Sequence, residues 1–595
     1  MPPIYEGNKK VIARYIGSAA VSSVMIGEKS CFAGILPSTG RTFLAKLKSS
    51  LILDEGTGGP TWSRATPAWR FNDQGYLRQI PNGCAEFGGA RLVWNTVRVK
   101  SEDFSSADWN KTGSVTVSEL NVIVCNNATS QQYLSQNAVA GFSIGDTVLC
   151  YTRIKRISGG ANFIQLSGGS SGFGNGQFAN FSLVDGTYNA TGCTASSALV
   201  SGTTDTYDCY IRPVVTFGGT NDRFNIGFAN DISSSRLPSF VGDGIKSFQL
   251  LRTASYIVTG YNSSYVPPYV SVGVVATPFF GAGTDGAKYF KTDWQGTPIP
   301  DANLLGFRRE AAATNNLLYC RDLSNAAWST KTNITADKTA TGLDGIANTA
   351  TTLTATAADA TILQPITLAS AARCASAYVE RVTGTGTISF TQDGGSTWTD
   401  ITAQINAATY IRAQITSTLS NPSVGFKIST SGDAINVDVV QNEAGTVATS
   451  PIVTTTAAVT RNAESLTYQT ASNWSDTDGT AYVQTTPVVY SGGAVGSATN
   501  GLLLSTSNSG ATAYDGTNAA NGPTGTPGAT EKLAVAWGSS AMSVASSGSV
   551  GTAGTYDGAM GLSSIGIGVG AVGYFGDVAI YNYKMTDAEL QAITS

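Results

Sequence analysis

The first 30 residues contain two short apolar runs, residues 11–17 and 21–27, and each ends at a glycine. Both runs have the length of a β-strand, and their spacing of roughly ten residues predicts a small hairpin or meander. No apolar run in the chain reaches the length of about 18 residues that a membrane-spanning helix needs. The pattern therefore predicts strands at the start of the chain and no insertion into a membrane.

Composition extends this prediction to the whole chain. Only 13% of the 595 residues are charged, against roughly 25% in typical soluble proteins. Long amphipathic helices need charged outer faces, whereas strands accept Thr, Ser and Asn on the solvent face. A chain of this length also exceeds what one hydrophobic core can hold. We expect an all-β chain with several domains.

A repeated order of motifs indicates an internal duplication. A tryptophan, a strand with Tyr and basic residues, a Tyr-Ile-Arg strand and a Gln-containing strand follow one another twice, each time over some 150 residues. The two copies carry these motifs at Trp109, 151–155, 210–212 and 247–250, and at Trp328, 378–382, 410–412 and 440–445. Repeated units of this kind are best interpreted as modules along an axis rather than one globule.

A connector precedes each module. Asn72-Asp73-Gln74-Gly75 and Asp293-Trp294-Gln295-Gly296 are turn signals, because glycine adopts positive φ without steric cost. These connectors resemble the linkers of bacteriophage tail-fibre and virion proteins. The modules resemble carbohydrate-binding-type jelly rolls, although residues 265–269 of the first depart from the usual family ending.

The C-terminal region resembles a laminin-G/concanavalin-like sandwich. The resemblance rests on Gly573–Tyr583, a strand motif that precedes a short terminal helix. Thr586 is placed as the N-cap of that helix and Glu589 follows three residues later, which is the spacing of a capping box. The short apolar runs at the N-terminus resemble segments of phage tail and baseplate-associated proteins.

Together these features predict a multi-domain string of β-sandwich (jelly-roll) modules with a short N-terminal docking region. The expected division is as follows: an N-terminal particle-docking segment, 1–50; a connector, 51–100; the first β-sandwich module, 101–277; a second connector, 278–318; the second β-sandwich module, 319–461; and the laminin-G/concanavalin-like sandwich, 462–595.

Several kinds of chemistry are excluded by the residues that the chain lacks. It contains no histidine, which removes Ser-His-Asp and Cys-His nucleophiles and His-ligated zinc. Its eight cysteines are scattered without metal-ligand spacing, so we expect free buried thiols; Cys193 with Cys209 is the one pair to test for a bridge. The formal net charge of −4 with no basic block argues against nucleic-acid binding.

Carboxylate chemistry is the remaining enzymatic option. Candidate acids are Asp476 with Asp478, Glu102 with Asp103, and Glu119. Neighbours at i and i+2 usually serve a turn rather than flank a sugar ring, so we expect no catalytic residues and no enzyme. We also expect no cofactor and no metal, with a structural calcium held by Asp476, Asp478 and Asp577 as the alternative.

Glycan binding requires an aromatic platform with polar partners. The ligand-binding candidates are Trp398, in a polar Gly-rich hairpin, and Trp474 with Asp476 and Asp478. Trp109 and Trp328 occupy equivalent positions at the start of the two modules, and we expect them to be core or hinge residues because tryptophan is buried on average. Strand arginines are expected to make structural ion pairs or backbone contacts; these are Arg153, Arg212, Arg381 and Arg412.

The resemblance implies a fibre or spike on the tail or capsid exterior of a bacteriophage particle, made in the host cytoplasm. It would be a homo-oligomer, expected to be a trimer, that docks to other virion proteins through residues 1–50 and attaches to host-surface glycan. Repeated weak sites would then act through avidity. The alternatives are a capsid or tail decoration protein without a ligand, and a polysaccharide depolymerase.

Overall fold

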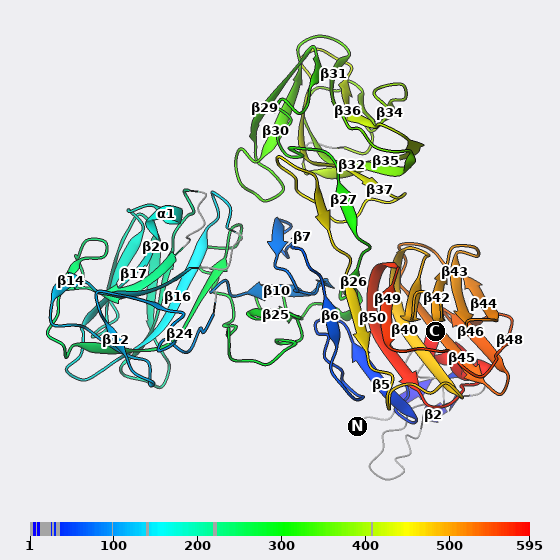
Figure 1. The fold of residues 1–595 in the computed structure, drawn as a ribbon, viewed down its shortest axis with the longest axis horizontal. Helices are drawn as coiled ribbons and strands as arrows, with labels where there is room; N and C mark the ends of the chain where they lie inside the picture. The colour runs from blue at the N-terminus through cyan, green and yellow to red at the C-terminus, as the bar shows by residue number, and fades with distance from the viewer. Residues whose placement is uncertain are drawn as a thin grey trace.

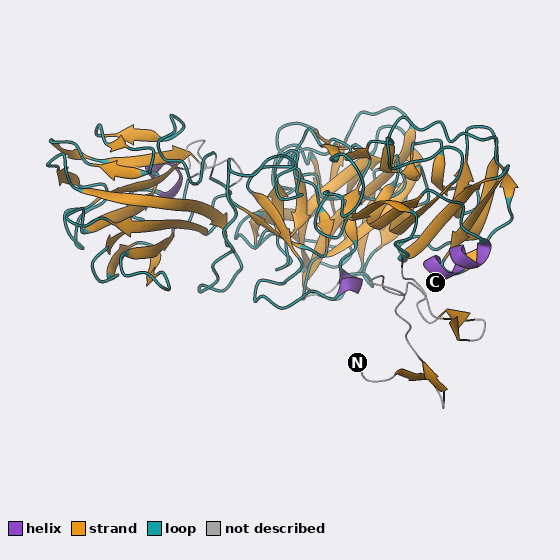
Figure 2. Ribbon diagram, turned by 90° about the horizontal axis from the view of Figure 1, so that it is seen from below, coloured by secondary structure: helices purple, strands orange, loops and turns teal. Residues whose placement is uncertain are grey.

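The structure, a computed structural model, describes residues 36–97, 99–137, 142–217, 223–405 and 408–595, together with four short strands nearer the N-terminus. The described residues are almost entirely strands and turns (Figures 1 and 2), which confirms the all-β prediction. The helical segments are α1 (Ser170–Phe173), the 3-10 helix η1 (Asp301–Asn303) and α2 (Asp587–Thr594). None of the described helices has the length and apolar character needed to cross a membrane.

The four short strands form two antiparallel pairs. β1 (Ile4–Glu6) pairs with β2 (Lys9–Val11), and β3 (Met25–Ile26) pairs with β4 (Lys29–Ser30). Most of the two apolar runs at residues 11–17 and 21–27 lies outside the described residues, as does Cys31. A docking role for residues 1–50 therefore stays a prediction.

The first sandwich consists of two six-stranded antiparallel sheets, in the orders β11-β15-β22-β17-β18-β19 and β12-β13-β24-β16-β21-β20. Its core includes Phe104, Trp109 and Phe248, all buried between the sheets. A separate pair, β14 with β23, lies beside them. The strands are β11 (Asn110–Thr112), β12 (Thr116–Val117), β13 (Val122–Val124), β14 (Thr129–Gln131), β15 (Tyr133–Asn137), β16 (Val148–Arg156), β17 (Phe163–Gly168), β18 (Phe178–Ser182), β19 (Tyr188–Thr191), β20 (Thr194–Leu199), β21 (Thr206–Arg212), β22 (Arg223–Phe228), β23 (Ser239–Val241) and β24 (Ser247–Ile257).

The second sandwich has two five-stranded sheets, in the orders β28-β31-β36-β33-β34 and β29-β30-β37-β32-β35. Trp328, Phe390 and Phe426 belong to its buried core. The strands are β28 (Thr330–Thr332), β29 (Ile334–Ala340), β30 (Ala350–Ala355), β31 (Ala360–Pro365), β32 (Ala371–Thr383), β33 (Ile388–Thr391), β34 (Thr399–Asp400), β35 (Ile411–Leu419), β36 (Ser423–Ile428) and β37 (Ala434–Ala444).

The strand orders of the two sandwiches correspond one to one. β11-β15-β22-β17-β18 matches β28-β31-β36-β33-β34, and β12-β13-β24-β16-β21 matches β29-β30-β37-β32-β35. The first sandwich differs by β19 and β20, which add one edge strand to each sheet. Ten strands in the same connectivity are what a duplicated module requires, so the topology agrees with the repeat seen in the sequence.

The C-terminal sandwich also has two sheets, but it recruits strands from the start and middle of the chain. One sheet has nine strands, with β40 and β50 at its centre, and takes in β5, β9 and β26; the other has seven strands and takes in β6. The recruited strands are β5 (Arg41–Lys46), β6 (Thr61–Ser63), β9 (Phe87–Gly88) and β26 (Gly306–Arg309). The sandwich's own strands are β39 (Ser465–Tyr468), β40 (Gly479–Val489), β41 (Gly493–Gly496), β42 (Gly501–Ser505), β43 (Gly510–Tyr514), β44 (Ala519–Thr524), β45 (Glu531–Gly538), β46 (Ala541–Ser546), β47 (Ser549–Val550), β48 (Gly554–Thr555), β49 (Ile565–Val569) and β50 (Val572–Tyr581).

The terminal helix α2 begins as the sequence predicts. The Thr586 hydroxyl accepts from the Glu589 amide at 3.3 Å, and the Glu589 carboxylate accepts from the Thr586 amide at 2.8 Å. Two otherwise unpaired amides of the first turn are thereby satisfied, which confirms the capping box.

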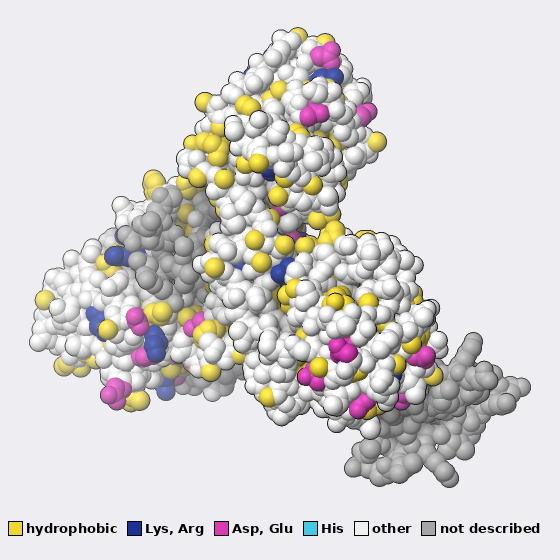
Figure 3. All heavy atoms as spheres, turned by 45° about the vertical axis from the view of Figure 1, so that its right-hand side comes forward, with side chains coloured by type: hydrophobic (Ala, Val, Ile, Leu, Met, Phe, Trp, Pro, Cys, Tyr) yellow, Lys and Arg dark blue, Asp and Glu magenta, His cyan; other side chains and the backbone are white. Residues whose placement is uncertain are grey.

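The two predicted connectors pair with each other and form a hub, defined here as residues 61–97 and 285–315. Its strands are β6, β7 (Ala68–Phe71), β8 (Leu77–Ile80), β9, β10 (Arg91–Trp94), β25 (Ala287–Phe290), β26 and β27 (Ala313–Asn315). β10 pairs with β25, β9 pairs with β26, and β27 pairs with β38 (Val459–Arg461) at the end of the second sandwich. Figure 1 shows the three sandwiches as lobes around this hub. Charged side chains are thinly scattered on the face seen in Figure 3, as the composition implies.

Candidate functional site: a cavity at the hub

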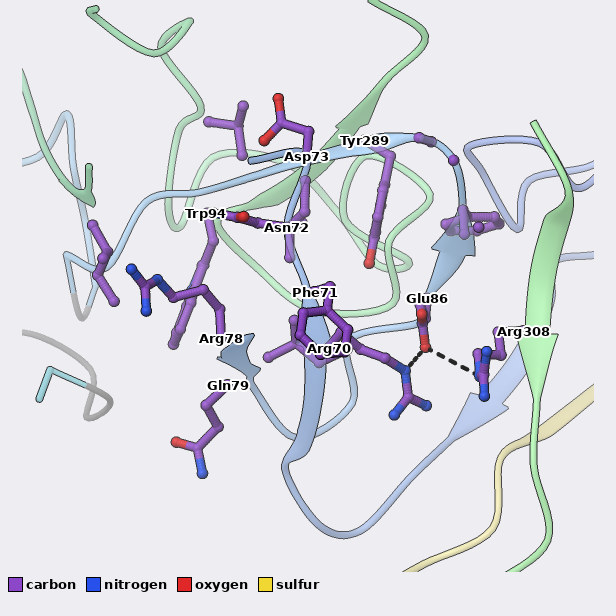
Figure 4. A pocket seen from close by; sticks show the side chains of 18 of the residues that line it. Arg70, Phe71, Asn72, Asp73, Arg78, Gln79, Glu86, Trp94, Tyr289 and Arg308 are labelled. Carbon is purple, nitrogen blue, oxygen red and sulfur yellow. Dashed lines mark ion pairs between the residues drawn. The ribbon is translucent and has the colours of Figure 1, made fainter. Parts of the chain in front are cut away.

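A cavity of about 490 Å³ lies where the hub meets all three sandwiches. This volume falls in the range of ordinary small-ligand sites. The hub contributes the hairpin β7–β8, the segment 86–94, Tyr289 and Arg308 to its wall. The first sandwich and its C-terminal extension contribute residues between 256 and 267; the second contributes Tyr378 and Arg412, and the third Tyr574. Figure 4 shows the side chains around the cavity.

The β7–β8 hairpin is shaped by the turn that its sequence predicts. The side-chain oxygen of Asn72 accepts from the amides of Gln74, at 3.0 Å, and Tyr76, at 2.9 Å. Gly75 has a φ of 78°, which glycine adopts without a Cβ clash. The second predicted turn, at residues 293–296, has the same geometry. The Asp293 side chain accepts hydrogen bonds from the amides of Gln295 and Thr297, and Gly296 has a φ of 90°.

The tip of this hairpin is wedged between the first two sandwiches. The ring of Tyr76 lies against Gly260 on one side and Gly345 on the other. A Cβ on Gly260 would stand 2.1 Å from a ring carbon, and one on Gly345 would stand 2.3 Å away. The amide of Leu77 also donates to the carbonyl of Leu343 at 2.8 Å. These contacts fix the hairpin against both sandwiches.

Arg78, on β8, follows Tyr76 and Leu77 and lines the cavity. Its Nη1 donates to the carbonyls of Asp344, at 2.8 Å, and Leu77, at 3.1 Å. Its Nη2 is 4.0 Å from an oxygen of Asp146 and has no hydrogen-bond acceptor within the described part of the chain. Burial lowers the pKa of Arg78, because neighbouring carboxylates compensate only in part for the lost hydration.

A buried ion network closes the opposite wall. Arg70 and Arg308 both pair with Glu86, as the dashed lines in Figure 4 mark. Both also donate to Glu310, at 2.9 and 2.6 Å. Glu310 is fully buried, and its remaining bonds come from the amide of Ser450, at 2.9 Å, and its hydroxyl, at 2.7 Å. These arginines hold the pKa of Glu310 well below its usual range despite burial.

Glu464 extends the network into the start of the C-terminal sandwich. It pairs with Arg461 at 3.0 Å and with Arg64 and Arg70 at 3.6 Å. Arg461 also lies 3.5 Å from Glu310. The network therefore joins both connectors, the end of the second sandwich and the third sandwich through charges that are largely removed from water.

Aromatic side chains supply much of the remaining wall. Trp94 is half-buried, and Phe71 is 42% exposed and meets Tyr378 edge-on at 5.7 Å. Tyr261 and Tyr265 stack at 4.6 Å. In Figure 4, Trp94, Arg78 and Gln79 lie on one side of the cavity and Glu86 and Arg308 on the other, with Phe71 between them. Rings beside amide and guanidinium groups make a surface that can stack on a sugar and hydrogen-bond its hydroxyls.

Asp73 is one of the two carboxylates in the wall. It accepts a hydrogen bond from the Tyr261 hydroxyl and lies 4.0 Å from Nε of Arg91. Burial raises the pKa of Asp73 above its ordinary value. Arg91 in turn donates to the Tyr265 hydroxyl at 2.6 Å, so the acid, the two tyrosines and the arginine hold one another in place.

The residues predicted from the sequence to bind ligand lie elsewhere. Trp398 is half-buried in the hairpin between β33 and β34, with the Lys427 ammonium 5.4 Å from its ring centre. Trp474 stacks at 4.5 Å on the fully buried Trp537 and donates to Asp476 at 3.2 Å. Asp476 and Asp478 are exposed. None of these four residues lines the cavity, and their ligand roles stay predictions.

The expected core roles of the module tryptophans are confirmed. Trp109 is 2% exposed and donates to the carbonyl of Lys100 at 3.1 Å; Trp328 is 1% exposed and donates to that of Tyr319 at 3.3 Å. Each indole thus bonds the backbone nine residues earlier, which places the two tryptophans at equivalent points of the repeat.

The strand arginines are structural, as expected. Arg153 makes two bonds of 2.7 Å to Asp208. Arg212 and Arg381 donate to backbone carbonyls, at 2.7 Å to Tyr265 and 2.8 Å to Gly386. Arg412 donates to the carbonyl of Thr449 and to Ser376, but it also reaches the cavity wall.

The described cysteines are all free thiols, including Cys193 and Cys209, so the bridge considered between them is not formed. Burial raises the pKa of Cys193 to about 11 and that of Cys84 to about 12. Within the described ranges, no three His, Cys, Asp or Glu side chains are grouped as a metal site would require. Asp577, considered for calcium, lies on β50 with its pKa raised by burial.

No protein-family model matches the chain, and neither does any curated protein sequence. Among solved structures, it is similar to the tandem CBM22-1-CBM22-2 domains of Paenibacillus barcinonensis Xyn10C. That similarity covers 59% of this chain and 99% of the other, at 10% sequence identity and a TM-score of 0.22. A likeness this distant carries no functional argument.

Sequence reasoning did not identify the cavity residues. Arg78, Gln79 and Trp94 lie in a segment that its turn signals mark as a connector. The signal that was present is the density of aromatic and basic residues around the Asn72–Gly75 turn, which a plain linker does not need.

Proposed function

We propose that this chain is a non-enzymatic surface component of a bacteriophage particle, a fibre or spike that binds host-surface glycan in the cavity at the hub. The particle assignment rests on the resemblance of the connectors to linkers of phage tail-fibre and virion proteins, and of the N-terminal runs to segments of phage tail and baseplate-associated proteins. The glycan assignment rests on the cavity.

One observation carries the glycan proposal: a cavity of ligand size brings Trp94 and Phe71 together with the polar groups of Asn72, Arg78 and Gln79. Sugar rings present apolar faces and directional hydroxyls, and this wall offers a partner for each. The wedged hairpin holds these groups in place before a ligand arrives, which lowers the entropic cost of binding.

The carboxylates of the wall support binding rather than hydrolysis. A glycosidase needs one carboxyl group that donates a proton and a second that acts as base or nucleophile. Glu86 is already neutralised by Arg70 and Arg308, and Asp73 accepts a hydrogen bond from the Tyr261 hydroxyl. The depolymerase alternative requires one of these acids to be released from its partner.

A glycan array tests the proposal with the full chain. We expect binding to bacterial envelope polysaccharides, and a loss of up to about tenfold in affinity for Trp94→Ala, because stacking on an aromatic ring is worth about 0.5–1.5 kcal/mol. Trp398→Ala is the matched control and should bind as the wild type does. Binding to no glycan would favour a decoration protein, and release of reducing ends would establish a depolymerase.

Self-association belongs to the same proposal. A homotrimer would present three cavities and raise the effective affinity of weak sites without new contacts. Light scattering on the purified chain should give three times the mass of one chain, and a monomer at all concentrations would refute this part alone.

A further inference from the structure

Resting on the proposed function, we infer that the ligand of the cavity is an acidic saccharide whose carboxylate is bound on the Arg78 side of the wall. Any sugar residue with a carboxylate belongs to this class. It follows from the charges of the wall, from their partners and from the rings beside them.

The wall carries an excess of positive charge. Four arginines line it, Arg70, Arg78, Arg308 and Arg412, against two acids, Asp73 and Glu86. The difference, four minus two, is +2, in a chain whose formal net charge is −4. Such a wall favours an anion only at an arginine that the protein has not already paired with a carboxylate.

Two of these arginines are already compensated. Arg70 and Arg308 share Glu86 and Glu310, so their charges are matched inside the protein. Arg412 and Arg78 differ from them. Arg412 donates to a carbonyl and a hydroxyl, and Arg78 donates to two carbonyls.

Arg78 is the stronger candidate of the two. Its nearest carboxylate oxygen, on Asp146, is 4.0 Å from Nη2, and Nη2 makes no hydrogen bond to any described residue. The partners of Arg78 compensate its buried charge only in part, so a carboxylate bound against this side of the wall would gain from the charge that remains. Trp94 and Gln79 lie on the same side in Figure 4, where a sugar ring and its hydroxyls would be placed.

The experiment uses the full chain and the polysaccharides that it binds on the array. The carboxyl groups of the best binder are chemically reduced to hydroxymethyl groups, and affinities for the two forms are compared by calorimetry. We expect reduction to weaken binding at least about tenfold, and excess inorganic phosphate not to displace the saccharide. Arg78→Met should lose the preference for the acidic form, and Arg156→Met, a half-buried arginine outside the cavity, should keep it.

Three results would contradict this inference or the proposed function. Binding only to neutral glycans, or unchanged binding after reduction, would overturn the acidic class and leave glycan binding intact. Binding of inorganic phosphate alone as tightly as the acidic saccharide would show a simple anion site and overturn the saccharide class. Absence of binding to any glycan would sink the proposed function itself. The comparison of native and reduced polysaccharide uses wild-type protein, so it decides the question even where Arg78→Met does not fold.

Discussion

Replacing Glu310 with glutamine tests whether the buried ion network holds the hub together. The network contains four arginines, Arg64, Arg70, Arg308 and Arg461, and three acids, Glu86, Glu310 and Glu464. Glutamine keeps the size of the side chain but removes one of three negative charges. Removing one partner of a buried ion pair costs about 3–5 kcal/mol, and we expect the lower end because the amide oxygen still accepts one bond.

The assay is thermal unfolding followed by calorimetry. For a cooperative unit of roughly 150–250 residues, about 3 kcal/mol lowers Tm by roughly 6–12 °C, so the transition of the hub and C-terminal sandwich should fall by that amount. Glu119→Gln, an exposed glutamate of the first sandwich, is the control and should melt with the wild type. If Glu310→Gln melts within about 1 °C of Glu119→Gln, the network does not stabilise the hub and the reasoning fails.

The same residue predicts a pH dependence. The pKa of Glu310 is lowered on folding, so its contribution to the free energy of unfolding is fully present above the unfolded value of about 4.3 and is lost as pH falls through the lower folded value. Wild-type stability should therefore fall below about pH 4, with a smaller fall in Glu310→Gln. Equal slopes in the two proteins would contradict the assignment.

Three further outcomes test other parts of the account. Gly260→Ala should push the Tyr76 ring out of its contact and expose the β7–β8 turn to proteases. Gly432→Ala is the control, because Gly432 has the same φ of 85° but open space around it, so only backbone strain is added. Equal cleavage of the two variants would show that the Tyr76 contact does not hold the hairpin. Trp474→Ala should lower the Tm of the C-terminal sandwich, since it removes the stack on Trp537, yet leave glycan affinity unchanged; lost affinity would return the site to Trp474. In a Cys31→Ser background, a disulfide reagent at neutral pH should modify Cys193 before the other cysteines of the folded protein, because Cys193 is half-buried and the other described thiols are buried. Labelling of Cys193 should be slow, because its pKa of about 11 leaves little thiolate. Rapid labelling of several thiols would contradict the burial of the others.

The turns and the helix cap could be predicted from the sequence, because each depends only on residues that are neighbours in the chain. Asn72 to Gly75 forms a turn because the amide side chain bonds the backbone and glycine takes positive φ. Thr586 and Glu589 cap a helix for a similarly local reason. The order of tryptophan, Tyr-strand and Gln-strand revealed the duplication because equivalent strands keep equivalent core positions.

The hub could not be predicted from the sequence, because its strands pair with partners that are far away along the chain. β10 pairs with β25 almost 200 residues away, and β5 and β50 lie at opposite ends of the chain. No residue pattern within either connector indicates that the two connectors pair with each other. The cavity depends on those pairings, so the sequence marks Arg78 and Trp94 as connector residues, and the polar, turn-rich surroundings of Trp398 and Trp474 led the ligand prediction to the second and third sandwiches instead.

The central claim is that the hub cavity holds the glycan, and a density map of the full chain with its best-binding oligosaccharide tests it most directly. We expect density for a sugar ring against Trp94, with polar contacts to Gln79 and Arg78. Density at Trp398 or Trp474 with an empty cavity would contradict it.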